Sequence, residues 1–227
     1  MTDRHSAPEQ DGRVARGEST RTKLLEAAVR IFAERGFADV TTRELADAAG
    51  VNQAAILYHF GSKEQLHLAA AEYVATRARA ALHDALGEHA SSGATAIDTL
   101  RAVVRALTRG MIAMASDGAV ADFIVREQAQ AGPAFDVLYR GYIREVHERV
   151  TALVARATHR GADDPSAIID AHAIVGMTLS FAAARSTFLR RTRSRRYGAA
   201  EVDEIAERVA ELATRALHPR RVRTPPA

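Results

Sequence analysis

Residues 41–66 read TTRELADAAGVNQAAILYHFGSKEQL, and this stretch decides the fold. It predicts a helix, a tight turn, a very short second helix and the capped start of a third. Thr41 and Glu44 form a T-x-x-E capping box, in which each side chain bonds the backbone of the other. Gly50 stands where the first helix ends in left-handed backbone. Asn52 is a good N-cap for the next helix.

The short second helix is predicted to have one inward and one outward side. Ile56 and Phe60 are four residues apart and are expected to face the core. Gly61 breaks the helix, and Ser62 with Gln65 forms an S-x-x-Q box that starts the next one. In a helix-turn-helix, the N-terminus of the second helix enters the DNA major groove. The residues that this helix would present are Gln53, Ala54, Ala55, Tyr58 and His59.

A further helix precedes this unit and is expected to be capped by Ser19 or Thr20. Phe32 belongs to its apolar stripe. Gly36 follows its last turn, so that Phe37 can fold back onto Phe32. The chain therefore predicts a three-helix unit over residues 18–66, preceded by a polar arm at 1–17 that we expect to be disordered.

Residues from about 19 to 68 resemble the DNA-binding domain of the TetR family of bacterial transcriptional regulators. The resemblance is carried by the glycine-phenylalanine break at 36–37, by TTRELADAAGV at 41–51, by YHF at 58–60 and by SKE at 62–64. One position departs: Leu57 stands where the family often has a tyrosine that supports a phosphate contact. The later stretch FIVREQAQAGPAFDVLY, residues 123–139, resembles the C-terminal domain of the CecR-like subgroup.

Composition indicates an all-α, intracellular protein. The chain has 227 residues, of which 47% are hydrophobic, and alanine is abundant while runs of β-branched residues are short. Cysteine is absent, which excludes disulfides, thiolate chemistry and cysteine-based zinc sites. The first residues are polar, unlike a signal peptide, and no uninterrupted apolar run approaches the ~20 residues of a membrane span. We therefore expect a cytoplasmic location, and we predict no metal and no cofactor.

Three kinds of DNA contact are predicted. Gln53 can bond an adenine edge in two places, and Ala54 and Ala55 can contact a thymine methyl group. Tyr58 and His59, one turn later, can reach a phosphate or a base, although His59 could equally be a packing residue. Phosphate contacts from helix N-termini are predicted for Thr42, Arg43 and Lys63. Arg13, Arg16, Arg21 and Lys23 can follow the DNA backbone, or can simply be solvated.

Residues 67–218 are expected to form a larger helical domain, followed by a disordered tail at 219–227. Helical periodicity marks its last two long helices at about 165–190 and 200–217. The family resemblance implies that these two pair with their copies in a homodimer; ordinary core helices would show the same pattern. It also implies a pocket for an unknown small-molecule effector. Its candidate lining residues, each of which could also be core, are Met111, Met114, Phe123, Arg126, Phe135, Tyr139, Tyr142, His147, His172 and Met177.

The most probable reading is a ligand-released repressor that binds double-stranded DNA as a homodimer on a near-palindromic operator. An activator of the same family is an alternative, and so is an architectural, non-specific DNA-binding protein that uses the arginine-rich segment 190–196. That segment is otherwise a solvated loop. An enzyme is not expected, because the chain shows no nucleophile elbow, no phosphate-binding glycine loop and no H-E-x-x-H motif.

Overall fold

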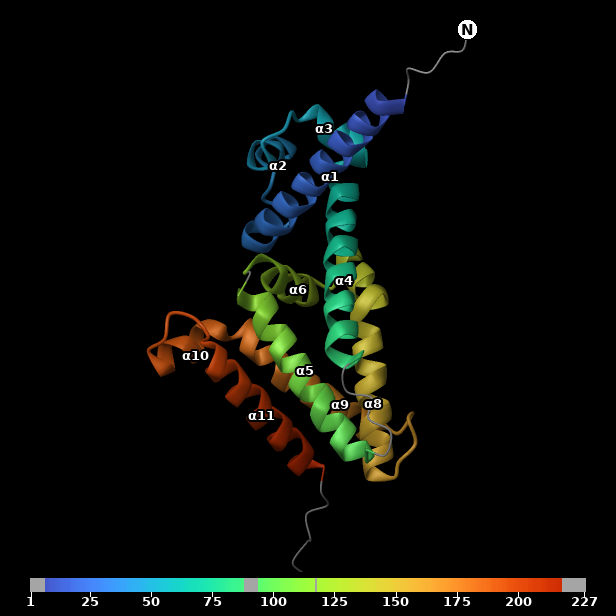
Figure 1. Ribbon diagram of the computed structural model, residues 1–227, viewed down its shortest axis with the longest axis vertical. Helices are drawn as coiled ribbons and strands as arrows, with labels where there is room; N and C mark the ends of the chain where they lie inside the picture. The colour runs from blue at the N-terminus through green and yellow to red at the C-terminus, as the bar shows by residue number, and fades with distance from the viewer. Residues whose placement is uncertain (1–6, 88–93, 117, 218–227) are drawn as a thin grey trace, which may run out of the picture. The chain divides into compact units, whose positions relative to one another are not determined.

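A computed structural model describes residues 7–87, 94–116 and 118–217, with side chains described from Gly17 onward except at 84–87. It is helical throughout and has no strand in these ranges, which confirms the all-α prediction (Figure 1). The predicted tail at 219–227 lies outside the described residues. The helices are α1 (Ala7–Arg35), α2 (Thr42–Ala49), α3 (Ala54–Phe60), α4 (Lys63–Gly87), α5 (Ala96–Ser116), α6 (Ala119–Gln130), α7 (Pro133–Leu138), the π-helix η1 (Tyr139–Ile143), α8 (Arg144–Thr158), α9 (Pro165–Ala183), α10 (Arg185–Thr192) and α11 (Ala199–Ala216).

The chain forms two compact units. The first unit combines Met1–Thr76 with Asp122–Leu138, and the second combines Arg77–Ala121 with Tyr139–Ala227. The first unit therefore holds the three helices α1 to α3, the beginning of α4, most of α6 and all of α7. Its core consists of large apolar side chains that are essentially inaccessible to solvent: Leu24, Phe32, Leu45, Ile56, Leu66 and Phe123.

Helix α1 begins at Ala7, well before the predicted cap at Ser19 or Thr20. The segment between Ala7 and Ser19 is rich in Ala, Glu, Gln and Arg, which are good helix formers. Pro8 lies in the first turn, where its missing N–H costs nothing. A helix nucleated by the apolar stripe can extend backward through such residues, because propagation needs no new nucleus.

In the second unit, α5, α8, α9 and α11 pack around one apolar core. Two ion pairs connect α5 to α11 at their edges. Arg105 Nη1 lies 2.7 Å from Glu207 Oε2, and Arg109 Nε lies 2.9 Å from Asp203 Oδ1. Because all four side chains are partly exposed, each pair contributes at most about 1 kcal/mol. The apolar core therefore supplies most of the stability.

Two predicted long helices are interrupted. The helix expected over 165–190 ends at Ala183, and α10 begins at Arg185 after a break at Ala184, whose φ is −108°. The arginine-rich segment that we predicted as a loop is thus partly helical. The helix expected from Phe135 to Ala157 contains five π-helical residues at Tyr139–Ile143. Neither break has a proline or glycine signature at its first residue, so neither could be read from local sequence.

Helix α9 is unusual in combining an apolar sequence with poor burial. It is the one helix in the described ranges that is long and apolar enough to cross a membrane, yet only 28% of its most apolar window is buried. Its cap follows the prediction, since Asp164 Oδ1 accepts from Ser166 N–H at 2.7 Å and Pro165 occupies the first turn. Ile168 and Ile169 remain 50% and 67% exposed. Such a surface calls for a partner or a ligand.

Candidate DNA-binding site

Local capping fixes the start and end of α2. Thr41 Oγ1 accepts from Glu44 N–H at 3.2 Å, while Thr41 N–H donates to Glu44 Oε2 at 2.8 Å, so the predicted capping box is formed. Gly50 ends the helix with φ +64°, as predicted from its position. A side chain at this φ would be strained by about 1–2 kcal/mol. These devices set the angle at which the chain leaves α2.

Glu44 also joins α2 to the end of α1. Its Oε1 lies 2.6 Å from Arg35 Nη1. The hydrogen bond from Arg35, together with those from the side chain and backbone of Thr41, lowers the pKa of Glu44 to about 2. Glu44 is therefore a carboxylate at any physiological pH. The pair stands at the surface, so it orients the helices more than it stabilises them.

Helix α3 has the inward and outward sides that the sequence predicts. Asn52 Oδ1 accepts from Ala54 N–H at 2.9 Å and so caps the helix. Ile56 is 2% exposed and anchors α3, whereas Tyr58 is 85% exposed. Phe60 is half-buried, with the Arg21 guanidinium 5.4 Å above its ring. One buried residue in a seven-residue helix leaves most of its side chains free to contact a partner.

Gln53 and Thr42 are brought together at the N-termini of α3 and α2. Gln53 Nε2 donates to Thr42 Oγ1 at 2.8 Å. An amide nitrogen carries two hydrogens, so a second N–H and the amide oxygen remain for another partner. This is the pair of groups needed to bond an adenine in two places. The Thr42 bond restricts the side chain of Gln53 before any partner binds.

Lys63 has two internal contacts that the sequence did not predict. Its Nζ donates to the Val40 carbonyl at 2.6 Å and lies 4.2 Å from the centre of the Phe37 ring. Phe37 itself folds back toward Phe32, with ring centres 6.0 Å apart, as expected after Gly36. An ammonium group has three donor hydrogens, so Lys63 can bond Val40 and still donate to a phosphate.

The N-termini of α2, α3 and α4 border one shallow hollow, lined by Thr42, Asn52, Gln53, Ala54, Ile56, Leu57, Gly61 and Ser62. Helix N-termini carry partial positive charge and unpaired N–H groups, which favour anions such as phosphate. Sequence reasoning had not selected Asn52, Leu57 or Ser62 for this surface. Leu57 is 71% exposed, and its position outside the buried stripe of Ile56 and Phe60 could have signalled this.

The other predicted DNA-contacting residues lie on the same three helices. Arg43 is exposed at the start of α2, with its Nε 3.9 Å from Asp47 Oδ2. Ala55 and His59 are half-buried on α3. The His59 ring meets the Tyr58 ring edge to face at 4.9 Å. Arg13 and Arg16 lie outside the described side chains.

Behind this surface, the first unit contains a buried polar layer. His67 on α4 and Glu127 on α6 are hydrogen-bonded, with 2.9 Å between Nε2 and Oε1, and they are 9% and 1% exposed. The rings of Phe32, Phe37 and Phe123 surround His67 at 4.7, 5.0 and 5.8 Å. Phe123, a predicted effector-contacting residue, is thus part of this core.

Arg126 and Glu127 do not form the ion pair that their adjacency suggested. Arg126 instead donates from Nε to the Ala33 carbonyl at 2.9 Å and from Nη2 to the Glu34 carbonyl at 3.0 Å. These carbonyls belong to the last turn of α1, where no helical N–H follows to bond them. Adjacent residues on a helix point in different directions, which is why the two side chains find separate partners.

The remaining effector-pocket candidates do not converge on one cavity. Met111, Met114 and Tyr142 line a cavity of about 20 Å³ between α4, α5 and η1, which has room for one water molecule. Burial raises the pKa of the Tyr142 hydroxyl. Met177 lines a separate groove of about 420 Å³ between α9, α10 and α11. Phe135 is half-buried in the first unit, and Tyr139 is 43% exposed in the second.

His147 on α8 and His172 on α9 form a stacked pair, with ring centres 5.4 Å apart. Burial, and secondarily the neighbouring His172, lowers the pKa of His147. No third metal-ligating side chain joins them or forms another such group in the described part of the chain. The pair therefore reads as a packing contact between α8 and α9.

A three-helix unit whose shortest helix is capped, anchored by one residue and otherwise exposed defines a helix-turn-helix DNA-binding protein. The family model for "Bacterial regulatory proteins, tetR family" matches residues 24–70, and that for "HTH-type transcriptional dual regulator CecR, C-terminal domain" matches residues 96–218. The CecR regulator of Shigella flexneri is 35% identical over 191 residues, which cover 78% of this chain and 82% of that protein. The repressor KstR2 of Rhodococcus jostii is 38% identical over 87 residues, covering 38% of this chain and 39% of that protein.

Solved structures agree. A TetR-family member from Streptomyces coelicolor A3 has 27% identity and a TM-score of 0.60, covering 84% of this chain and 89% of that one. The ketosteroid regulator KstR2 of Mycobacterium tuberculosis has 19% identity and a TM-score of 0.61, covering 86% and 93%, which shows the shared fold alone. The chain belongs to the TetR family and carries a CecR-type C-terminal domain. It is a DNA-binding transcriptional regulator and not an enzyme.

Proposed function

We propose that the protein is a cytoplasmic repressor that binds a near-palindromic operator as a homodimer and leaves it when a small molecule binds. The observation that carries DNA reading is the Gln53–Thr42 hydrogen bond of 2.8 Å at the mouth of the hollow between three helix N-termini. It holds an amide with spare donor and acceptor groups beside a surface suited to phosphates.

Residue roles follow from exposure and chemistry. Gln53 reads a base, while Ala54, Ala55 and the exposed Leu57 contact thymine methyl groups. Tyr58 and His59 reach a phosphate or a base edge one turn later. Thr42, Arg43 and Lys63 bind phosphates and set the register of the module on the duplex. Residues 18–66 act as the DNA-binding domain, with 67–218 as the effector-binding and dimerisation domain.

The dimer forms through α9 and α11. Helix α9 exposes Ile168 and Ile169, and α11 exposes Leu212, which is 51% exposed. A symmetric pairing of these two helices would bury all three side chains and their copies. Two recognition helices related by a two-fold axis would then read half-sites one helical turn or more apart. Relatives named as repressors, and CecR named as a dual regulator, support repression with activation as a second outcome.

Selection of bound sequences from a random duplex pool, at near-physiological salt, tests this proposal. An enriched inverted repeat is expected. Binding that shows no sequence preference and only fades with salt would instead favour an architectural protein. Reporter assays with the selected site upstream or downstream of a promoter would then separate repression from activation.

Matched variants test the residue roles on the selected operator. Gln53→Ala is expected to relax preference at one position of each half-site, costing about 1–3 kcal/mol there. Gln130→Ala, an exposed glutamine on α6, is the control and should leave preference unchanged. Lys63→Met keeps the stem over Phe37 and should weaken binding to all sequences alike. A changed preference at constant affinity would show that Lys63 does not contact phosphate.

A further inference from the structure

The second unit has a ligand-sized groove that lies apart from the small cavity between α4, α5 and η1. The groove measures about 420 Å³, within the range of small-molecule sites, whereas the cavity of about 20 Å³ holds a single water. Its walls come from α9, α10 and α11. We propose that this groove binds an amphipathic anion with an acyl-type chain of about twelve carbons.

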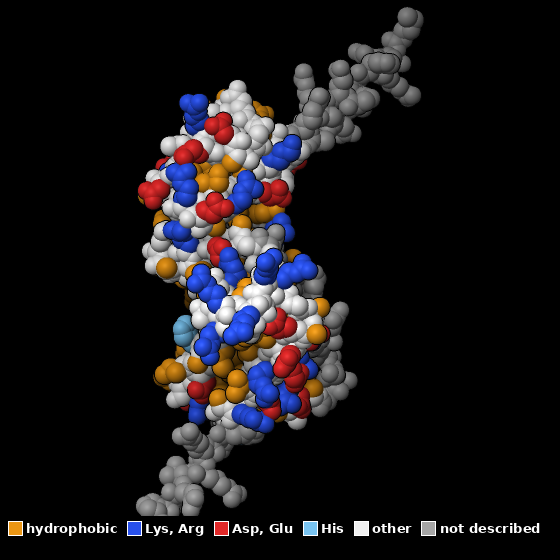
Figure 2. Space-filling model, turned by 90° about the vertical axis from the view of Figure 1, so that its left-hand side faces the viewer, with side chains coloured by type: hydrophobic (Ala, Val, Ile, Leu, Met, Phe, Trp, Pro, Cys, Tyr) orange, Lys and Arg blue, Asp and Glu red, His pale blue; other side chains and the backbone are white. Residues whose placement is uncertain are grey.

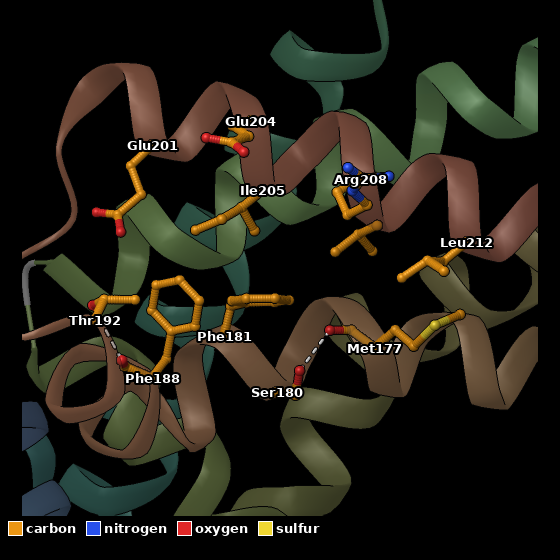
Figure 3. A pocket seen from close by; sticks show the side chains of 11 residues that line it. Met177, Ser180, Phe181, Phe188, Thr192, Glu201, Glu204, Ile205, Arg208 and Leu212 are labelled. Atoms are coloured by element: carbon orange, nitrogen blue, oxygen red, sulfur yellow. Dashed lines mark hydrogen bonds between the residues drawn. The ribbon is translucent and has the colours of Figure 1, made fainter.

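The groove is apolar along its length. Figure 3 shows Phe181, Phe188 and Ile205 pointing toward one another, with Met177 and Leu212 at the far end. The aromatic wall is held in place, since Phe188 meets Phe181 at 5.5 Å and Tyr197 at 5.6 Å, and Tyr197 Oη donates to the Phe181 carbonyl at 2.7 Å. A wall fixed in this way loses little conformational freedom when an apolar chain enters.

The length of the groove sets the length of the ligand. Its lining along α11 runs from Glu201 to Leu212, about 16 Å at 1.5 Å per residue. An extended chain of about twelve carbons, with bonds of about 1.5 Å, has a comparable length. Shorter chains would leave part of the apolar wall in contact with water.

The charge at one end of the groove selects an anion. Thr192 lines the groove between Arg191 and Arg193, and Arg190, Arg195 and Arg196 complete a cluster of exposed arginines. We call these five residues the arginine cluster. None of them forms an ion pair with any residue that the structure describes, and no Asp or Glu occurs between Ala171 and Ala200. The face drawn in Figure 2 shows basic side chains bordering an apolar strip.

The backbone concentrates this charge. Arg193 adopts φ +57° and ends α10, and Ser194 N–H then bonds the Leu189 carbonyl at 2.9 Å. The chain therefore turns back at once, which keeps the arginines together. Arginine presents planar donors that match carboxylate and phosphate geometry. An anionic head group at this end and a chain along the phenylalanine wall would satisfy both features.

The acidic lining residues are already engaged or stand at the rim. Glu201 Oε2 accepts from Gly198 N–H at 3.2 Å and caps α11. Arg208 bonds Glu211 at 3.0 Å. Glu204 stands beside the α11 ribbon in Figure 3, outside the aromatic cluster. Two carboxylates against five arginines leave the α10 end net positive, so a cationic amphiphile is disfavoured.

Titration calorimetry on the full-length protein tests the proposal with three probes below their micellar concentrations. Dodecanoate is expected to bind. Butanoate, which lacks the chain, and dodecyltrimethylammonium, which reverses the charge, should each bind at least tenfold more weakly. Equal binding of dodecanoate and the cation would overturn the assignment of the arginine cluster, and binding of the cation alone would reverse the ligand class.

Two pairs of variants localise the site. Ser180→Phe places a ring in the groove and should abolish dodecanoate binding, while Ser186→Phe, on the exposed part of α10, should not. Arg191→Gln combined with Arg193→Gln and Arg195→Gln should weaken binding about tenfold. Arg79→Gln combined with Arg149→Gln and Arg156→Gln, equally exposed positions outside the groove, is the control. Undiminished binding to Ser180→Phe would refute the site.

Only the regulatory consequence rests on the proposed function. Dodecanoate that binds in calorimetry and also lowers affinity for the selected operator would identify an effector class. Binding without any change in operator affinity would leave the site standing and refute its role in release. Absence of binding, with Ser180→Phe converting a dimer into monomers by light scattering, would show that the groove holds the second copy and would overturn the proposal.

Discussion

Replacing Glu127 by alanine is expected to destabilise the protein by about 2–4 kcal/mol. The side chain is 1% exposed, and its Oε1 lies 2.9 Å from Nε2 of His67. Leaving a buried imidazole without its partner costs about 1–3 kcal/mol. Loss of one buried methylene adds about 0.8 kcal/mol. Glu148→Ala is the control, because Glu148 is 72% exposed and lies 3.7 Å from Arg144, a pair that contributes at most about 1 kcal/mol.

Urea unfolding followed by circular dichroism measures the effect, with the slope of the transition checked for constancy. His67→Phe combined with Glu127→Leu should recover most of the loss, because an apolar pair of similar volume often replaces a buried polar pair without penalty. Phenylalanine suits the surrounding rings of Phe32, Phe37 and Phe123. The reasoning is refuted if Glu127→Ala costs no more than Glu148→Ala, or if the double variant is less stable than Glu127→Ala.

Three further predictions concern the backbone and pH. Gly36→Ala should lose at least about 1 kcal/mol in the same assay, because φ is +85° and the new Cβ would lie 3.2 Å from Arg126 Nη1; an unchanged midpoint would contradict this. The pKa of Glu44 falls from 4.5 to about 2 on folding, so its contribution is complete above pH 4.5 and is lost as pH falls toward 2. Glu44→Gln should flatten the stability profile in that window, and an identical profile would argue against the Arg35 contact. The lowered pKa of His147 means that the unfolded chain binds more protons below pH 6.5, so stability should fall as pH decreases from there. His147→Gln should reduce that slope, unless the stacked pair is absent in solution.

Much of the DNA-binding unit was predictable, because its signals act over a few residues. The capping box at Thr41, the left-handed Gly50 and the cap at Asn52 each depend on neighbours within four positions. The helical period of 3.6 placed Ile56 inward and Tyr58 outward, and burial confirms both. The start of α1 was missed, since residues with good helix propensity but no apolar stripe extend it to Ala7.

The candidate site was only partly predictable, because several of its contacts are not local. The bond from Gln53 to Thr42 spans 11 residues, and the one from Lys63 to Val40 spans 23. Periodicity identified these residues as exposed or charged but could not name their partners. Leu57 was treated as a departure from the family pattern, while its 71% exposure makes it part of the surface.

The sequence by itself determined the helical class, the helix-turn-helix and most helix ends, because capping and periodicity are read along the chain. Tertiary structure alone decided that α6 packs in the first unit, where Glu127 meets His67 across 60 residues of chain and Arg126 closes the end of α1. It also decided the break at Ala184 and hence the groove between α9, α10 and α11. Such features depend on which surfaces meet when helices pack, and a one-dimensional pattern specifies that a face is apolar without specifying what it will face.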